Sequence, residues 1–160
     1  MNLLELFKPI RSFMFDIEGV LTDGTLLVSG GGTPVYGLHS RDLYALEKAQ
    51  AAGYTVIFLS ENNPEAVCSF LKQSGFSHIY TYIKDKAPFL PQLPADLSTT
   101  LYMGDDMPDF AAMQLCAMAA CPNDAVAEIR EKAAYISPRN GGTGCVRDVL
   151  EKVLKLNSCW

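Results

Sequence analysis

Reactive side chains recur along the chain in an order that could carry out phosphoryl transfer. They follow apolar runs or stand in a polar segment: Asp16, Ser60, Lys86 and the Gly104-Asp105-Asp106 run. A carboxylate can accept a phosphoryl group, and hydroxyl and ammonium groups can hold its oxygens. Asp16 and Asp105 together would supply the oxygen ligands that Mg2+ prefers, with waters and a substrate phosphate completing its octahedron. These residues therefore predict a Mg2+ site and a phosphoryl-transfer reaction that proceeds through an aspartyl-phosphate.

Short apolar runs alternate with helical patterns, which is typical of a parallel sheet covered by helices on both faces. The expected strands cover Ser12–Phe15, Thr55–Leu59, His78–Tyr80, Thr100–Met103, Ala117–Ala120 and Ala134–Ile136. Asp16, Ser60 and Asp105 each come just after one of these strands. In open parallel sheets the site lies outside the carboxyl ends of the strands, near the point where the strand order reverses. The sequence therefore predicts a Rossmann-like α/β fold that brings these side chains together.

Helices are expected between the strands, and their ends carry recognisable signals. Ser40 is the expected cap of the first helix, Gly53 ends it, and Asn63-Pro64 opens the second. The side chains expected to face the core are Leu43, Leu46 and Ala49 in the first helix and Val67, Phe70 and Leu71 in the second. Further helices are expected over Lys86–Leu93, Pro108–Leu115, Ala125–Lys132 and Gly144–Leu156.

The segment from Gly24 to Leu38 separates the first strand from the first helix. Thr25–Ser29 and Val35–Leu38 flank Gly30-Gly31-Gly32, a pattern that predicts a β-hairpin with a mobile tip. Because this hairpin comes directly after the Asp16 loop, it would stand over the site as a flap or provide an edge for assembly.

Length and composition limit the classes of protein to which the chain can belong. Its 160 residues fit one domain, residues 1–160, that can bury a core without disulfides. The formal net charge of -5 and the lack of a Lys/Arg-rich run argue against nucleic acid or a membrane as partner. Five cysteines without a CxxC pair, and no signal peptide, favour reduced thiols and a cytoplasmic location. The expected partner is therefore a small anionic substrate.

The motifs resemble those of a known family over nearly the whole chain. Asp16-x-Glu18-Gly19-Val20-x-Thr22-Asp23-Gly24, with Ser60, Lys86 and Gly104-Asp105-Asp106-x-x-Asp109, is similar to the haloacid dehalogenase-like phosphohydrolases. The short hairpin in place of a large cap domain, Ser40-Arg41-Asp42 and the glycine-rich run 141–144 resemble the capless branch that contains 3-deoxy-D-manno-octulosonate 8-phosphate phosphatase. The resemblance implies a HAD-like fold with a hairpin flap.

The resemblance also implies a role for each site residue. Asp16 would be the nucleophile, and Ser60 and Lys86 would bind the phosphoryl oxygens. Asp16, the main-chain carbonyl of Glu18 and Asp105 would hold Mg2+, while Asp109 would support the metal site and Lys86. Arg41 is a candidate substrate contact, with a first-turn helix residue as the alternative. The implied reaction is hydrolysis of a small sugar-acid phosphate, 3-deoxy-D-manno-octulosonate 8-phosphate or a related nonulosonate phosphate. Because the branch is typically tetrameric, a homotetramer is expected, in which a neighbouring subunit covers each open site.

Two positions depart from the family pattern. The family usually has a second Asp two residues after the nucleophile, as acid and then base, whereas this chain has Glu18, one methylene longer. General acid-base work contributes roughly 10² to 10⁴-fold in rate, so the alternative is a weakly active or inactive protein that binds a phosphorylated metabolite. After Ser60, Glu61-Asn62-Asn63 replaces the common Gly-Arg and removes positive charge near the expected sugar acid.

A third class of protein, the receiver-type signalling domain, also combines acidic residues, a hydroxyl residue and a Lys. Receivers place the paired acids early and the Lys last, whereas here Asp105-Asp106 follows Lys86. The order therefore favours the phosphohydrolase. Asp106 could equally be a helix cap, because Asp favours such positions, and Arg147 is expected on the surface of the last helix.

Overall fold

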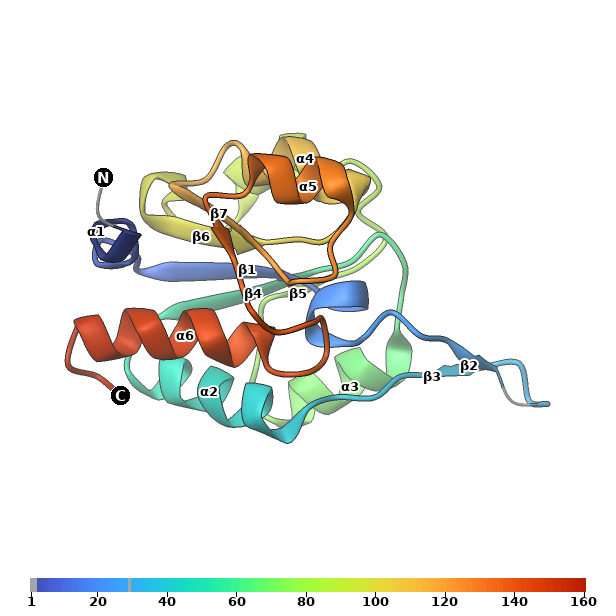
Figure 1. Cartoon of the computed structure of the whole chain (residues 1–160). Helices are drawn as coiled ribbons and strands as arrows, with labels where there is room; N and C mark the ends of the chain where they lie inside the picture. Colours follow the sequence, from blue (N-terminus) through green and yellow to red (C-terminus); the bar gives the residue numbers. More distant parts are fainter. Residues whose placement is uncertain (1–2, 29) are drawn as a thin grey trace.

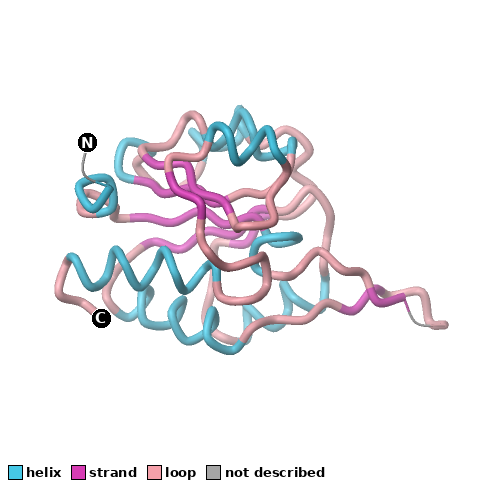
Figure 2. The backbone as a smooth tube through the Cα atoms, in the orientation of Figure 1, coloured by secondary structure: helices cyan, strands magenta, loops and turns pink. Residues whose placement is uncertain are grey.

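A six-stranded parallel sheet between two layers of helices forms the body of the protein (Figures 1 and 2). The structure is a computed structural model that describes residues 3–28 and 30–160. The strands are β1 (Ser12–Asp16), β4 (Thr55–Leu59), β5 (Ile79–Tyr80), β6 (Thr100–Met103), β7 (Met118–Cys121) and β8 (Tyr135–Ile136), in the order β5-β4-β1-β6-β7-β8. The order reverses at β1, so the carboxyl end of β1 lies at the point where such sheets bind ligands. The predicted Rossmann-like fold is confirmed.

The strand at the centre of the sheet is buried on both faces, as parallel strands require. All five residues of β1 are buried. Phe13 and Phe15 join the core under one helix layer, and Met14 joins the core under the other. The rings of Phe13 and Phe15 stack with centroids 6.0 Å apart. This double burial fixes the position of Asp16 at the strand end.

The helices cover the sheet on two sides. They are α1 (Leu3–Phe7), α2 (Ser40–Ala51), α3 (Glu65–Gln73), α4 (Met107–Met113), α5 (Ala127–Lys132) and α6 (Cys145–Leu156). Figure 1 shows α2, α3 and α6 on one face and α4 and α5 on the other. Three other helical segments are η1 (Ile17–Leu21), η2 (Ala87–Gln92) and η3 (Leu97–Thr99). No helix within residues 3–28 and 30–160 is long and apolar enough to cross a membrane.

Three details of the expected helices differ in the structure. His39, not Ser40, caps α2, because its Nδ1 accepts a hydrogen bond from the Arg41 amide at 3.3 Å. Phe70 is 45% exposed and Cys68 is buried in its place. A helix has about 3.6 residues per turn, so a buried stripe centred between residues 67, 68 and 71 leaves residue 70 at its edge. In addition, the helix expected over Lys86–Leu93 is a 3-10 helix, η2, that contains Pro88 and Pro91.

The hairpin between η1 and α2 is short and extends away from the sheet (Figure 1). Its strands are β2 (Leu27–Val28) and β3 (Pro34–Val35), which pair antiparallel. The paired segments are shorter than expected, and Ser29 lies outside the described residues. Leu27 and Val28 are 62% and 72% exposed, so the hairpin presents apolar side chains to its surroundings.

Candidate active site

The turn that follows β1 carries the first candidate residues. β1 ends at Asp16, and η1 begins at once with Ile17 and Glu18. Gly19 has a φ of +92°, and a Cβ there would lie 2.0 Å from Oδ2 of Asp105. Any side chain at this position would therefore be strained and would clash. The glycine allows the loops after β1 and β6 to meet, which brings Asp16 and Asp105 to one place.

A buried ammonium group joins two of the carboxylates. Lys86 Nζ lies 2.5 Å from Oδ1 of Asp16 and 2.6 Å from Oδ1 of Asp109, and Lys86 is only 2% exposed. Burial alone would lower the pKa of Lys86, but the charges of Asp16 and Asp109 outweigh it and raise the pKa. Lys86 is therefore charged. A buried charge pair of this kind is costly to break from one side, because the remaining charge is left without a partner.

Asp109 is held by a third donor that the sequence did not suggest. The Tyr102 hydroxyl donates to Oδ1 of Asp109 at 2.7 Å, and the Asp105 amide donates to Oδ2 at 3.1 Å. Burial, followed by the charge of Asp109, raises the pKa of Tyr102 well above its usual range. The hydroxyl therefore keeps its proton and acts as donor. A tyrosine in a buried strand gives no sign of such a role in the sequence, although its position two residues before Gly104 is a weak signal.

Three carboxylates form a cluster that could hold a cation. One oxygen each of Asp16, Asp105 and Asp109 lies within 4.8 Å of the others. Oδ1 of Asp105 is buried and has no hydrogen-bond partner among residues 3–28 and 30–160. Burial and then Asp109 raise the pKa of Asp16 well above its usual range, and the same two causes raise that of Asp105 to about 7. One ammonium does not balance three carboxylates, so an oxygen-seeking divalent cation such as Mg2+ fits here.

Glu18 and Ser60 contact each other rather than the carboxylate cluster. The buried Ser60 hydroxyl lies 2.8 and 3.0 Å from the two carboxylate oxygens of Glu18, and it accepts from the Asn62 amide at 3.1 Å. The Glu18 side chain is therefore not among the carboxylates that could hold the cation. It does line the same cavity as Asp16, the nucleophile candidate.

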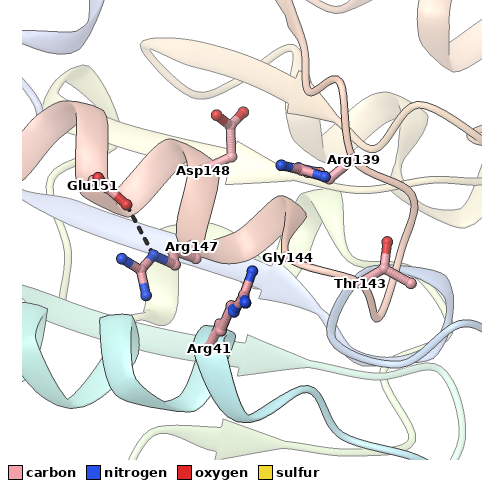
Figure 3. A pocket seen from close by; sticks show the side chains of 7 residues that line it. All are labelled: Arg41, Arg139, Thr143, Gly144, Arg147, Asp148 and Glu151. Carbon is pink, nitrogen blue, oxygen red and sulfur yellow. Dashed lines mark hydrogen bonds and ion pairs between the residues drawn. The ribbon is translucent and has the colours of Figure 1, made fainter.

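Except for Ser60, which donates to Glu18, and Tyr102, these residues line one cavity of about 150 Å³, which we call the carboxylate cavity. Its charged lining residues are Asp16, Glu18, Glu61, Lys86, Asp105, Asp106 and Asp109. Asp106 is exposed and caps α4 by accepting from the Met107 amide at 2.7 Å. Arg41 does not line this cavity but a different one, together with Arg147 (Figure 3). The structure thus brings six of the seven site residues expected from the sequence to one cavity or its immediate wall, and places Arg41 elsewhere.

Solved structures of similar proteins share this fold. A Legionella pneumophila protein described as a HAD superfamily (subfamily III A) hydrolase is 29% identical, with a TM-score of 0.92 over 98% of this chain and 88% of that one. The Moraxella catarrhalis 3-deoxy-D-manno-octulosonate 8-phosphate phosphatase is 28% identical, with a TM-score of 0.90 over 96% of this chain and 91% of that one. The chain therefore shares its fold, over nearly its whole length, with HAD superfamily hydrolases and 3-deoxy-D-manno-octulosonate 8-phosphate phosphatases. No protein-family model matches it.

Two curated proteins are similar to this chain over most of its length. The 3-deoxy-D-manno-octulosonate 8-phosphate phosphatase KdsC of Escherichia coli K12 is 26% identical over 151 residues, which are 92% of this chain and 80% of the relative. The N-acylneuraminate cytidylyltransferase of Oncorhynchus mykiss is 28% identical over 158 residues. The match covers 93% of this chain but only 37% of that protein's length. The predicted resemblance to the capless branch is therefore confirmed.

Proposed function

We propose that the chain is a Mg2+-dependent phosphomonoesterase that hydrolyses a small sugar-acid phosphate. The substrate would be 3-deoxy-D-manno-octulosonate 8-phosphate or a related nonulosonate phosphate. The buried Asp16–Lys86 pair beside Oδ1 of Asp105, which has no hydrogen-bond partner among the described residues, carries the proposal. One cavity thus combines a nucleophile, the Asp16 carboxylate, with an ammonium group that can neutralise phosphoryl oxygens and an oxygen atom, Oδ1 of Asp105, that can bind a metal ion.

The comparisons support the choice of reaction and substrate class. The Escherichia coli relative is a phosphatase, and the Moraxella catarrhalis structure holds a magnesium ion, a phosphate ion and a KDO molecule. Both curated relatives are named after sugar acids, an octulosonate and a neuraminate. The relatives thus favour a phosphatase over a protein that only binds a phosphorylated metabolite.

The proposed reaction has two steps at Asp16. In the first, a carboxylate oxygen of Asp16 bonds to phosphorus while the bond from phosphorus to the sugar oxygen breaks, and Glu18 donates a proton to the leaving oxygen. In the second, Glu18 removes a proton from a water molecule that attacks the aspartyl-phosphate. Inorganic phosphate leaves and the Asp16 carboxylate is restored.

The other residues bind and orient the reacting groups. Lys86 neutralises phosphoryl oxygens next to Asp16, and Asp109 holds Lys86 in place through its 2.6 Å ion pair. Ser60 would exchange its bond to Glu18 for a bond to a phosphoryl oxygen, leaving the Glu18 carboxyl to face the leaving group. Asp16, Asp105 and the main-chain carbonyl of Glu18 would hold Mg2+, with Asp109 behind them. When bound, Mg2+ would stabilise negative charge that develops on the phosphoryl oxygens.

Phosphate release from a panel of sugar phosphates tests this function. We expect turnover of a sugar-acid phosphate with Mg2+, none after chelation, and none in Asp16→Asn. The matched control is Asp96→Asn, since Asp96 is exposed, caps η3 at the far end of β6, and Asn can replace it as a cap. Turnover in Asp16→Asn equal to that of Asp96→Asn would rule out the aspartyl-phosphate route.

We also propose that the chain assembles as a homotetramer. The exposed apolar residues of the hairpin, Leu27 and Val28, support this, because their burial against another subunit would remove apolar surface from water. Light scattering on the full chain should give the mass of four chains. The mass of one chain would contradict the proposal.

A further inference from the structure

A second cavity, which we call the arginine cavity, lies at the start of α6 and has a volume of about 260 Å³. The side chains that line it are Arg41, Arg139, Arg147, Thr143, Asp148 and Glu151. Figure 3 shows Arg41 reaching up from the start of α2 and Arg139 reaching across from the loop before α6. The arginine cavity and the carboxylate cavity have no lining residue in common.

The acidic residues of the arginine cavity already have partners. Glu151 accepts from Nε of Arg147 at 2.8 Å and pairs with Lys155 at 2.6 Å. Asp148 is paired with Lys152 and also accepts from a tyrosine hydroxyl. These two carboxylates are therefore not vacant acceptors for the remaining arginines.

The positive charge of the arginine cavity is left uncompensated. Within residues 3–28 and 30–160, the guanidinium groups of Arg41 and Arg139 form no ion pair and no hydrogen bond. Two guanidinium groups without acidic partners thus converge on one hollow, in a chain whose formal net charge is -5. An anion would supply what they lack.

The third arginine is held in place before any ligand arrives. The guanidinium carbon of Arg147 lies 5.0 Å from the ring centroid of Trp160 and 5.8 Å from that of Tyr44. Together with the bond to Glu151, these cation–π contacts restrict the side chain, so less conformational freedom is lost on binding.

The donors for an anion must be the arginines, because the neighbouring donors are occupied. The buried Asp42 carboxylate accepts from the Gly144 amide at 3.2 Å and from the Arg147 amide at 2.7 Å. The Thr143 hydroxyl donates to the Asn140 carbonyl at 2.8 Å. The amide groups at the start of α6 are thus already hydrogen-bonded, so recognition of an anion would depend on the guanidinium groups of the arginines.

The geometry points to a binding site for a phosphate-bearing anion in the arginine cavity, either inorganic phosphate or a small phosphate monoester. Guanidinium groups present planar pairs of donors that match phosphate oxygens bidentately. The cavity is slightly smaller than the roughly 300 Å³ at which pockets for drug-sized ligands begin, which suits a small anion. The site does not depend on the reaction proposed for the carboxylate cavity.

Amide chemical shifts of the isotope-labelled full chain test the site. The chain is titrated with inorganic phosphate, and separately with glycerol 3-phosphate, in metal-free buffer whose ionic strength is held constant with sodium chloride. We expect saturable shifts at Thr143, Gly144 and the Arg139 side chain. If one of the two ligands binds more tightly, the site prefers that form of phosphate, the free ion or the monoester.

Variants separate specific binding from general charge attraction. Arg139→Ala should weaken binding by about tenfold, the effect expected for loss of one charged donor. Arg130→Ala, a matched change on α5 in the opposite helix layer, should leave the affinity unchanged. Because Arg139 is exposed, its replacement should leave the dispersion of the amide spectrum intact. Shifts that do not saturate, shifts confined to residues 16–19 and 60–62, or equal affinity in Arg139→Ala and the wild type would overturn the proposal.

Discussion

Replacing Tyr102 with Phe should lower the stability of the protein by removing a hydrogen bond to Asp109. The shape of the side chain changes very little, since only one oxygen atom is removed. The hydroxyl is buried and donates to Oδ1 of Asp109 at 2.7 Å. A hydrogen bond to a charged group contributes about 1.5–3 kcal/mol. Lys86 continues to donate to the same oxygen at 2.6 Å, so Asp109 keeps a partner. We therefore expect a loss near the lower end, about 1.5–2 kcal/mol in the free energy of unfolding.

The same substitution should lower turnover more than substrate affinity. Asp109 positions both the Lys86 ammonium and the Asp105 amide, so loosening Asp109 lets the Lys86 ammonium, the proposed phosphate ligand, move relative to Asp16. A misplacement of about 1 Å costs on the order of 10²-fold in rate. We expect kcat to fall by about 10- to 100-fold at saturating Mg2+, with a smaller change in KM. Urea unfolding measures the stability, and phosphate release measures the rate.

Tyr135→Phe is the matched control for this prediction. Tyr135 also donates its hydroxyl to an aspartate at 2.7 Å, but the acceptor is Asp148 on α6 and the pair is only partly buried. Its loss should cost less stability and leave kcat unchanged. If Tyr102→Phe and Tyr135→Phe had the same kcat as the wild type, the positioning role of Tyr102 would be refuted.

Two further predictions concern the protons of the carboxylate cavity. Glu18→Gln should lower turnover by about 10² to 10⁴-fold, because it removes the proposed general acid and base. Inorganic phosphate should still bind, since Ser60 can donate to the amide oxygen. Unchanged turnover under single-turnover conditions would contradict the proposed role of Glu18. In the metal-free protein, burial raises the pKa of Asp16 and raises that of Asp105 to about 7. The folded state therefore keeps protons that the unfolded chain loses near pH ~4, and stability should fall as the pH rises from about 4 to about 7. The midpoints of urea unfolding at pH 5 and pH 7.5 test this decrease in stability. Equal midpoints would show that the prediction is wrong. Added Mg2+ should reduce the difference between the two midpoints.

The fold was predictable because it depends on local apolar runs. Thr55–Leu59 and Thr100–Met103 are strands with the expected bounds, since each is a short apolar segment between polar signals. The position of Asp16 after the first run was enough to place it at the carboxyl end of a strand, whereas the strand order that makes this end the switch point comes from the structure. Phe70 was misplaced because a helix face is decided by what packs against it, and an aromatic residue at the edge of the stripe looks the same in the sequence as one at its centre.

The contacts within the candidate site were harder to predict because they join residues far apart in the chain. Each of Asp16, Lys86 and Asp109 has a recognisable motif, but the Tyr102 bond to Asp109 depends on how β6 and α4 meet. The pairing of Ser60 with Glu18 depends in the same way on neighbouring strands β1 and β4. The longer Glu side chain spans the gap between these strand ends, and no local pattern encodes that distance.

The two cavities carry opposite charge although the loops that form them touch. The Gly142 amide donates to the Val20 carbonyl at 2.9 Å, and a Cβ on Gly141 would lie 1.9 Å from the Gly19 carbonyl oxygen. The loop before α6 therefore packs directly on the turn that carries Glu18, which requires glycine. If Arg41 or Arg139 reached the carboxylate cavity, it would pair with the carboxylates and compete with a metal ion, because opposite charges attract strongly at short range in a poorly solvated site. Because the arginines line a separate cavity, the carboxylates remain available to a cation and the arginines to an anion.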